Sequence, residues 1–353
     1  MKVNKNELKR VLKKIGVCVG KLPEQSWISF QNNEGVLKFV ATDGKDVVIA
    51  SIPGDMTETI EFVIDYKELS SVIKLRGSEL EFIKDERKLT VKDDNTQLNF
   101  AVGDISEFNF TKSEVEEAGI DIKVKDLLKV IDNGSFAREE KEMTRKFMTG
   151  AELIIKEGKL TIISTNGKLL SKSSVDIENK EKECKCVISP KAIEAIRTFD
   201  TETVNIKTNE NMIVFGMNDC EYYIGLLNVE FPDITKFFEN KEEGSQYIFD
   251  KKEILESLSL LNTINDDVVN VECKENKIKM SSNNIKGSIE DTIVGEKKTG
   301  EDFNFAINKR MFESIFRNVQ ADKIVLKYLG LNTPIEYSDD SNDIGVMMPL
   351  RKN

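Results

Sequence analysis

A short pattern of strand and turn recurs three times along this chain of 353 residues. It reads EGVLKFVATDGKDV from residue 34, EGKLTIISTNGKLL from residue 157 and ENKIKMSSNNIKGS from residue 275. Thr42, Thr165 and Ser282 mark the same point in the three copies and lie 123 and 117 residues apart. A fixed internal period constrains the fold strongly, because each copy is expected to form the same structural unit.

Two further landmarks share this period. A short apolar strand precedes a helix-capping residue at Asp65, Ser189 and Asn308, with spacings of 124 and 119 residues. The segments SEFNF and VEFPD place Phe108 and Phe231 123 residues apart. We therefore predict three copies of one domain, at residues 1–117, 118–243 and 244–353. The joins are expected near the polar, acidic segments 112–119 and 240–246.

Each copy has the pattern of an α+β domain. An amphipathic helix opens it, and in the first copy Leu8, Val11, Leu12 and Ile15 form the apolar stripe. Alternating strands and a second, capped helix follow, which predicts two helices packed on an antiparallel sheet. The exposed edges of such sheets need partners. We expect the domains to join edge to edge and two chains to close head to tail as a dimeric ring.

Composition excludes several classes of function. The chain has no histidine, the commonest general base and metal ligand, and it carries no nucleotide-binding or hydrolase motif. Its five cysteines lack metal-ligand spacing. No apolar run approaches the ~18 residues that span a bilayer, and the N-terminus lacks a secretory signal. The sequence predicts a non-enzymatic cytoplasmic protein with reduced thiols, no membrane partner, no metal and no cofactor.

The net charge of −11 argues against nucleic acid as a partner, but the basic residues are segregated. They gather on the opening helix and, more sparsely, on the second helix of each copy. For any single helix, a solvated face is the simpler interpretation. Recurrence in three copies favours one continuous basic surface that holds a polyanion. The residues expected to line this surface and face the polyanion are Lys9, Arg10, Lys13, Lys14, Lys74, Arg76, Arg197, Lys309, Arg310 and Arg317.

Over its whole length the chain resembles the bacterial sliding clamp, the beta subunit of DNA polymerase III holoenzyme. The residues that carry the resemblance are VATDGKD from Val40, STNGKLL from Ser164, FPDI from Phe231 and VMMPLR from Val346. The resemblance implies a homodimeric ring of six domains around duplex DNA, without sequence specificity and without catalysis. It also implies that a clamp loader closes the ring on DNA, and that DNA polymerase and other proteins with clamp-binding motifs dock on it.

The resemblance also assigns two sites. A pocket between the second and third domains binds partner peptides, and its wall comprises Met148, Thr165, Gly167, Leu169, Leu170, Pro232, Lys236, Phe237, Asn308, Met311, Val346, Met347, Met348, Pro349, Leu350 and Arg351. Ring closure brings Leu98 and Phe100 of one subunit against Leu260 and Leu261 of the other. Methionine, leucine and proline suit an apolar groove that adapts to varied partners. Without the resemblance, VMMPL reads equally well as a buried terminal strand.

The chain departs from the family pattern near the pocket. Asn166 stands where the family usually has an acidic residue, and Lys168 with Leu169 where it has a basic pair. Asn109 replaces the proline that the second copy has at Pro232, and Lys352 and Asn353 follow the terminal arginine. An alternative interpretation is therefore a secondary or mobile-element clamp. Such a scaffold protein would keep the fold but bind altered partners.

Overall fold

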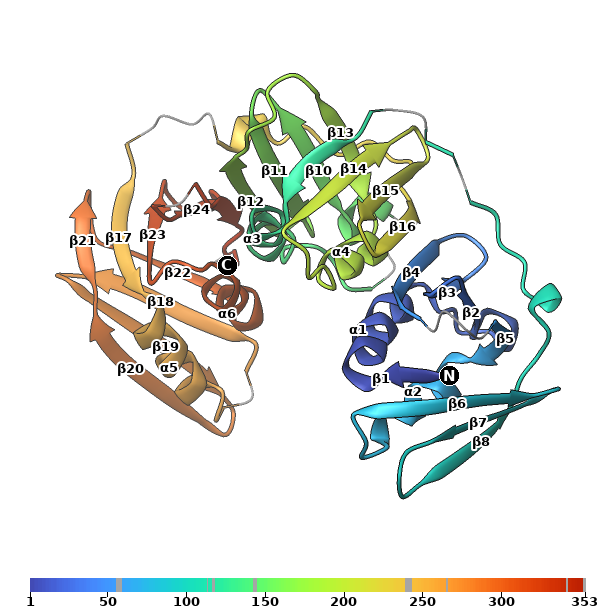
Figure 1. Cartoon of the computed structure of the whole chain (residues 1–353). Helices are drawn as coiled ribbons and strands as arrows, with labels where there is room; N and C mark the ends of the chain where they lie inside the picture. Colours follow the sequence, from blue (N-terminus) through green and yellow to red (C-terminus); the bar gives the residue numbers. More distant parts are fainter. Residues whose placement is uncertain are drawn as a thin grey trace. The chain divides into compact units, whose positions relative to one another are not determined.

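The computed structural model describes residues 1–54, 59–112, 114–115, 118–141, 145–238, 243–264, 266–340 and 342–351 (Figure 1). Both expected joins, at 112–119 and 240–246, fall partly outside these residues. The chain forms two compact bodies. The first comprises Met1–Lys125 and Ile188–Asn228, and the second comprises Asp126–Val187 and Val229–Asn353. These bodies are a different division from the three sequence copies, and the three-domain boundaries remain a prediction.

The first body contains an eight-stranded sheet in the order β5-β2-β3-β4-β16-β15-β14-β9 and a four-stranded sheet in the order β1-β6-β7-β8. Its helices are α1 (Lys5–Ile15), α2 (Tyr66–Ser71) and α4 (Pro190–Ile196). Its strands are β1 (Lys2–Asn4), β2 (Trp27–Asn33), β3 (Val36–Thr42), β4 (Val47–Pro53), β5 (Ile60–Asp65), β6 (Glu79–Asp85), β7 (Lys88–Lys92), β8 (Gln97–Ala101), β9 (Ile120–Lys123), β14 (Thr203–Thr208), β15 (Met212–Met217) and β16 (Cys220–Gly225).

The second body contains a nine-stranded sheet in the order β13-β10-β11-β12-β25-β24-β23-β17-β21 and a four-stranded sheet in the order β20-β19-β18-β22. Its helices are α3 (Val124–Gly134), which begins in the first body, α5 (Lys251–Leu261) and α6 (Lys309–Asn318). Its strands are β10 (Ala151–Lys156), β11 (Lys159–Thr165), β12 (Leu169–Asp176), β13 (Cys184–Ile188), β17 (Ser245–Asp250), β18 (Val268–Lys274), β19 (Lys277–Asn284), β20 (Gly287–Val294), β21 (Glu296–Thr299), β22 (Phe303–Asn308), β23 (Lys323–Tyr328), β24 (Ile335–Ser338) and β25 (Ile344–Met347).

Both large sheets are continuous across two sequence copies. In the first body β16 pairs with β4, with Tyr223 opposite Val47. In the second body β25 pairs with β12, with Val346 opposite Leu170. All strand pairs named here are antiparallel, and the helices pack on the sheets, so the α+β class is confirmed. The pairing of β4 with β16 and of β12 with β25 confirms that neighbouring copies join edge to edge.

The opening helix follows from its sequence pattern. The side chain of Asn4 caps α1 by accepting hydrogen bonds from the amides of Asn6 and Glu7. The predicted apolar stripe of α1 is buried against β3 and β4. The second helices begin at the predicted caps, because Asp65, Ser189 and Asn308 each accept a hydrogen bond from an amide in the first turn. These caps confirm the predicted helix starts.

A two-residue turn precedes the repeated strand in all three copies. Both turn residues have positive φ, at Glu34–Gly35, Glu157–Gly158 and Glu275–Asn276. Two successive positive φ values define the type I′ turn, whose twist matches that of the flanking strands. This shared turn explains why Glu is followed by Gly or Asn immediately before the repeated strand in each copy. Among the described residues, no helix combines the length and hydropathy needed to cross a membrane.

The turn after the repeated strand is shared by two copies only. Thr42 Oγ1 donates to Asp46 O at 2.8 Å and accepts from Gly44 N at 3.0 Å. Thr165 makes the same two bonds, to Leu169 O at 2.8 Å and from Gly167 N at 3.0 Å. In the third copy β19 continues past Ser282 to Asn284, so its turn comes later. The first two copies thus form the same turn geometry with different residues around the threonine.

Candidate functional site

The main candidate site is a cavity of about 250 Å³ in the second body. It lies where the turn after β11, the C-terminal segment after β25 and the segment around Pro232 meet. Its floor is mostly apolar and its rim carries charged side chains. The lining residues are Arg145, Phe147, Met148, Thr165, Gly167, Lys168, Leu169, Leu170, Pro232, Asp233, Ile234, Lys236, Phe237, Val346 and Met348.

The turn after β11 gives the cavity a fixed wall. Asn166 Oδ1 accepts from Lys168 N at 3.0 Å and from Leu169 N at 2.8 Å, which holds the turn closed. Gly167 has a φ of +83°, and a Cβ added there would lie 3.1 Å from Met148 Cε. A side chain at this position would therefore be both strained and crowded. The wall depends on glycine for its shape.

The C-terminal segment forms the facing wall. Beyond β25, Met348 N donates to Lys168 O at 2.8 Å and Leu350 N donates to Ala306 O at 2.7 Å, so the segment is fixed to the body along its length. Val346 and Met348 line the cavity, whereas the side chain of Met347 is fully buried in the core. Successive residues of a strand point to opposite faces. The prediction that Met347 forms part of the pocket wall is therefore wrong.

The third wall is the segment from Phe231 to Phe237. Phe231 is buried, and its ring packs edge-on against Phe147 with centroids 5.7 Å apart. The side chain of Asp233 accepts from Thr235 N at 2.9 Å and starts the short helical turn Thr235–Phe237. Pro232 and Asp233 stay exposed above this packed base. The wall is thus held by the aromatic contact of Phe231 and by the hydrogen bond between Thr235 and Asp233.

The rim is more basic than the rest of this acidic chain. Arg145, Lys168 and Lys236 are exposed around the cavity, and Asp233 is the acidic residue among the lining side chains. Hydrogen bonds from Thr235 hold the pKa of Asp233 below its ordinary value. The cavity can therefore take apolar side chains in its floor and acidic groups at its edge.

The corresponding turn in the first body has different chemistry. Asp43 and Asp46 replace Asn166 and Leu169, and both carboxylates pair with Lys191 of α4, with 2.9 Å between Lys191 Nζ and Asp46 Oδ2. Burial disfavours these charges. Hydrogen bonds from the backbone amide of Asp46 and from Lys191 nevertheless hold the pKa of Asp43 below its ordinary value, and the two carboxylates hold the pKa of Lys191 above its own. The first turn is closed by charge, whereas the second contributes an apolar side chain to the cavity floor.

Ten of the predicted wall residues line the cavity: Met148, Thr165, Gly167, Leu169, Leu170, Pro232, Lys236, Phe237, Val346 and Met348. Asn308, Met311, Pro349, Leu350 and Arg351 lie outside it, and the Asn308 side chain accepts from Met311 N as the cap of α6. Lys352 and Asn353 lie outside the described residues. The prediction missed Arg145, Phe147, Lys168, Asp233 and Ile234. The last two belong to the FPDI motif, which could have signalled them.

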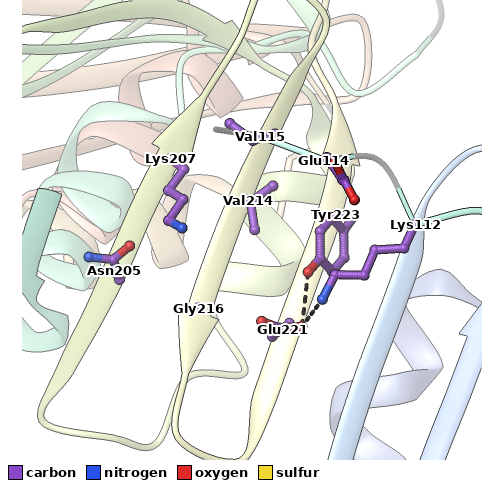
Figure 2. A pocket seen from close by; sticks show the side chains of 9 residues that line it. All are labelled: Lys112, Glu114, Val115, Asn205, Lys207, Val214, Gly216, Glu221 and Tyr223. Carbon is purple, nitrogen blue, oxygen red and sulfur yellow. Dashed lines mark hydrogen bonds and ion pairs between the residues drawn. The ribbon is translucent and has the colours of Figure 1, made fainter. Parts of the chain in front are cut away.

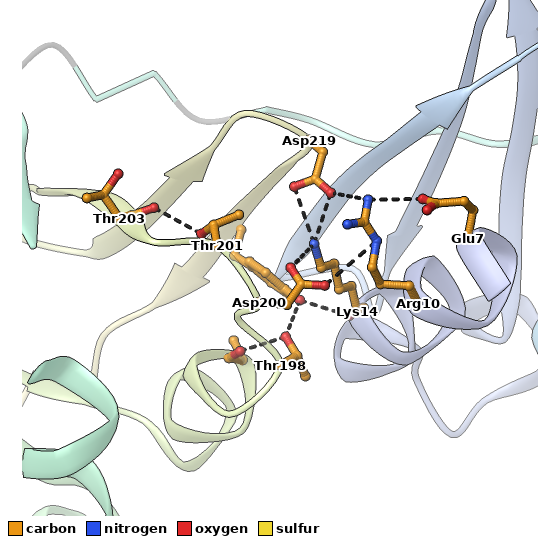
Figure 3. Close-up of polar contacts among 10 residues, drawn as sticks. Glu7, Arg10, Lys14, Thr198, Asp200, Thr201, Thr203 and Asp219 are labelled. Carbon is orange, nitrogen blue, oxygen red and sulfur yellow. Dashed lines mark hydrogen bonds and ion pairs between the residues drawn. The ribbon is translucent and has the colours of Figure 1, made fainter. Parts of the chain in front are cut away.

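Eight of the ten residues expected to face DNA are exposed: Lys9, Arg10, Lys13, Lys74, Arg76, Arg197, Arg310 and Arg317. Lys14 and Lys309 are buried. Lys14 Nζ lies 2.7 Å from Asp200 and 3.1 Å from Asp219 (Figure 3). Lys309 Nζ donates to Leu261 O at 3.2 Å and to Ile264 O at 3.3 Å. The expectation that these two lysines present their charges to DNA is corrected, because both charges serve the fold.

Of the four residues expected at a subunit interface, three are at least partly exposed and one is buried. Leu98 and Phe100 are half-buried on β8, the edge strand of its sheet. Leu260 of α5 is 52% exposed, but Leu261 is fully buried within the core of the second body. Leu261 therefore cannot offer its side chain to a second subunit, and that part of the prediction is wrong.

A second cavity, of about 480 Å³, lies on the sheet of the first body (Figure 2). Lys112 Nζ and the Tyr223 hydroxyl both contact the Glu221 carboxylate at 2.9 Å, and the ammonium lies 5.0 Å from the centre of the Tyr223 ring. Phe108 and Phe110 pack nearby. These charges satisfy one another and tie the chain before β9 to the sheet, so we assign the cavity a structural origin.

The described part of the chain holds no cluster of three or more histidine, cysteine, aspartate or glutamate side chains that could bind a metal ion. Burial raises the pKa of the Cys18, Cys220 and Cys273 thiols, which disfavours the reactive thiolate.

Replacing Lys309 with methionine is expected to lower the free energy of unfolding by about 1–3 kcal/mol, because the carbonyl groups of Leu261 and Ile264 each lose a charged donor. Arg310→Met is the matched control, since Arg310 is the exposed neighbour. Urea denaturation of both variants measures the difference. Equal stability of the two variants would contradict the buried role of Lys309.

Comparisons with known proteins agree with this geometry. Residues 121–233 match the family model described as DNA polymerase III beta subunit, central domain. A beta sliding clamp of Rickettsia felis is 23% identical, covering 94% of this chain and 93% of that protein. A beta sliding clamp of Staphylococcus aureus is 20% identical, covering 88% and 83%. The crystal structure of the DNA polymerase III beta subunit from Thermotoga maritima superimposes with a TM-score of 0.90 at 20% identity, covering 100% of this chain and 99% of that one. The chain therefore has the fold of the bacterial beta sliding clamps and is similar to them over almost its whole length, as the sequence resemblance indicated.

Proposed function

We propose that this protein is a non-catalytic processivity factor for DNA polymerase. Two copies form a ring around duplex DNA in the cytoplasm, and the polymerase and other partners dock on the ring through short peptides. The observation that carries the proposal is the apolar cavity with a basic rim, built by the turn after β11 and the C-terminal segment of a chain with the clamp fold. The cavity offers an apolar floor and a charged rim, which suit the binding of a partner.

The shape of the cavity supports binding of an extended peptide. Its volume of about 250 Å³ suits one or two large apolar side chains. A few buried apolar residues usually dominate the affinity of such complexes. Met148 and Met348 can adjust to anchors of different shape. Acidic groups of the peptide can meet Arg145, Lys168 and Lys236 at the rim, where charge affects selectivity more than strength.

The exposed cations support contact with a polyanion. Lys9 and Lys13 lie on the exposed side of α1, and Arg197, Arg310 and Arg317 are exposed at α4 and α6. Lysine and arginine at such positions bind phosphate groups irrespective of base sequence. Contacts of this kind, few and exposed, suit a protein that moves along the duplex.

Two edge strands support ring closure. β8 and β20 each end a four-stranded sheet, and an unpaired edge invites pairing with another chain. Apolar residues lie beside both edges: Leu98 and Phe100 on β8, and Leu260, Ile285 and Val294 near β20. Ile285 and Val294 were not predicted from the sequence. We propose that β8 of one subunit meets β20 and α5 of the other.

The secondary or mobile-element scaffold remains the second candidate. Asn166 makes the same turn hydrogen bonds as Asp43, from the second and third residues beyond it, but brings no charge. Asn166 therefore keeps the shape of the turn beside the cavity without the negative charge that Asp43 carries in the first copy. Altered partners are therefore compatible with an unaltered clamp fold.

The proposed function is tested by topology. After loading, the ring is expected to remain on circular DNA and to leave linear DNA through its ends. Gel filtration of the protein loaded on nicked plasmid, before and after linearisation, measures retention. Equal retention on both forms would reject an encircling ring and favour the scaffold. Native mass measured in parallel must correspond to two chains of 40.0 kDa.

Leu260→Glu is expected to convert the dimer into a folded monomer. The side chain of Leu260 is half exposed in the single chain, so a charge there disturbs a subunit contact rather than the core. Ser259→Glu is the matched control, because Ser259 is the exposed neighbour on α5. Native mass spectrometry and far-UV circular dichroism report the two properties. A dimer that persists in Leu260→Glu would place the interface elsewhere.

Deleting Met348–Asn353 is expected to abolish binding of polymerase-derived peptides and leave the dimer intact. The deletion removes one wall of the cavity, while β25 ends at Met347 and stays paired with β12. Deleting Lys352 and Asn353 alone is the control and should leave the affinity unchanged. Peptide titration and native mass on the same samples measure both properties. Undiminished affinity would place the partner site elsewhere, and loss of the dimer would show that the segment is structural.

A further inference from the structure

Helix α1 carries five cations. Lys5 donates to the carbonyl groups of Leu75 and Arg76, and the other four, Lys9, Arg10, Lys13 and Lys14, fall into two pairs. Lys9 and Lys13 are exposed, and neither forms an ion pair with another described residue. Arg10 and Lys14 instead contact carboxylates that come from more than 180 residues away (Figure 3). The cations of one helix are thus used in two different ways.

The contacts of Arg10 surround its guanidinium group with carboxylates. Arg10 Nη2 lies 2.8 Å from Asp219 Oδ2 and 3.2 Å from Glu7 Oε2, and Arg10 Nε lies 3.7 Å from Asp200 Oδ2. Lys14 Nζ bridges the same two aspartates, at 2.7 Å from Asp200 and 3.1 Å from Asp219. Figure 3 shows both cations directed at Asp200 and Asp219.

The two aspartates are positioned by the fold and not by the cations alone. Asp219 lies in the turn between β15 and β16, and its carbonyl oxygen accepts from Ser51 N at 2.8 Å. Asp200 follows α4, where the hydroxyl groups of Thr198 and Tyr222 lie 2.6 Å apart. The Tyr222 hydroxyl also donates to Lys14 O at 3.3 Å. These bonds hold the segments that carry Asp200 and Asp219 beside α1 without using Arg10.

The cluster reaches the surface at Arg10. The side chain of Arg10 is 41% exposed, those of Asp200 and Asp219 are 32% and 22% exposed, and that of Lys14 is 1% exposed. A phosphate group could approach Arg10 but not Lys14. A phosphate that binds Arg10 must compete with Asp219 for the guanidinium group, because Asp219 already holds Nη2 by a charge-assisted hydrogen bond of 2.8 Å.

We propose that Asp219, with Asp200, acts as a built-in counter-ion that withholds Arg10 from the phosphate backbone of DNA. The inference rests on the proposed function and deepens it. Lys9 and Lys13 remain available for DNA, so α1 contributes two cations instead of three. Each phosphate contact adds to affinity and to its salt dependence. Withholding one contact keeps the hold on the duplex weak, which favours sliding over arrest.

The test is the binding of the whole protein to a fluorescent 30-base-pair duplex by anisotropy over a series of salt concentrations. Asp219→Asn keeps the shape of the side chain and removes its charge. We expect tighter binding, by about 3- to 10-fold at low salt, and a steeper dependence of log affinity on log salt by about one unit. Asp200→Asn serves as a second variant should Asp219→Asn fail to fold.

The matched control is Glu221→Gln. Glu221 lies on the same strand as Tyr222 and pairs with Lys112, so the change in net charge is the same but Arg10 is not released. Its binding and salt slope should match those of the unmodified protein. An equal gain in both variants would reduce the effect to general charge repulsion and overturn the inference.

A double-mutant cycle assigns the effect to Arg10. Arg10→Gln alone should change binding little, because Arg10 is already withheld. In the Asp219→Asn background the same change should remove the gain. A gain that persists without Arg10 overturns the inference, as does an unchanged salt slope in Asp219→Asn. Neither result bears on the proposed function, which is decided by retention on circular DNA.

Discussion

The pairing of strands across sequence copies is the interaction on which the rest of the structure depends. Backbone groups at a sheet edge need hydrogen-bond partners, and a repeat that ends in an open edge can satisfy them with the next repeat. The pairs β4–β16 and β12–β25 do so in the two bodies. Each pair brings the turn of one copy beside the strand of another. The candidate cavity is a direct consequence, because β25 positions Val346 and Met348 opposite the turn after β11.

The same pairing produces two junctions with opposite chemistry. Thr42 and Thr165 make the same turn hydrogen bonds, so backbone shape does not distinguish the two turns. The difference lies in the side chains beside the turn. Asp43 and Asp46 engage Lys191 in the first body, and a paired, half-buried charge leaves little surface for a partner. Leu169 in the second body carries no charge and lies in the apolar floor of the cavity. The two turns share one backbone geometry. Different side chains at a few positions make only the second turn part of the candidate cavity.

Much of this could be predicted from local sequence. The period, the caps at Asp65, Ser189 and Asn308 and the apolar stripe of α1 depend on residues close together in the chain. The errors concern contacts between distant segments. Lys14 is buried because Asp200 and Asp219 come from elsewhere to meet it, and no local pattern signals this.

The errors at Met347 and Leu261 have a different origin. In both cases the prediction treated neighbouring residues as a group. On β25 alternate side chains face opposite sides, so Met347 enters the core while its neighbours line the cavity. On α5 consecutive residues point about 100° apart, so Leu260 is exposed and Leu261 is buried. The register of each element was needed to separate the surface residue from the core residue.

The charge distribution fits a protein that holds DNA by enclosure more than by attraction. The net charge is −11, and two of the ten predicted DNA-facing cations are buried in internal pairs or carbonyl contacts. A further one, Arg10, already has a carboxylate partner at 2.8 Å. Strong binding to DNA draws on many phosphate contacts and responds steeply to salt. A chain that neutralises its own cations gives up that strength, and the proposed closed path around the duplex would supply retention on DNA instead.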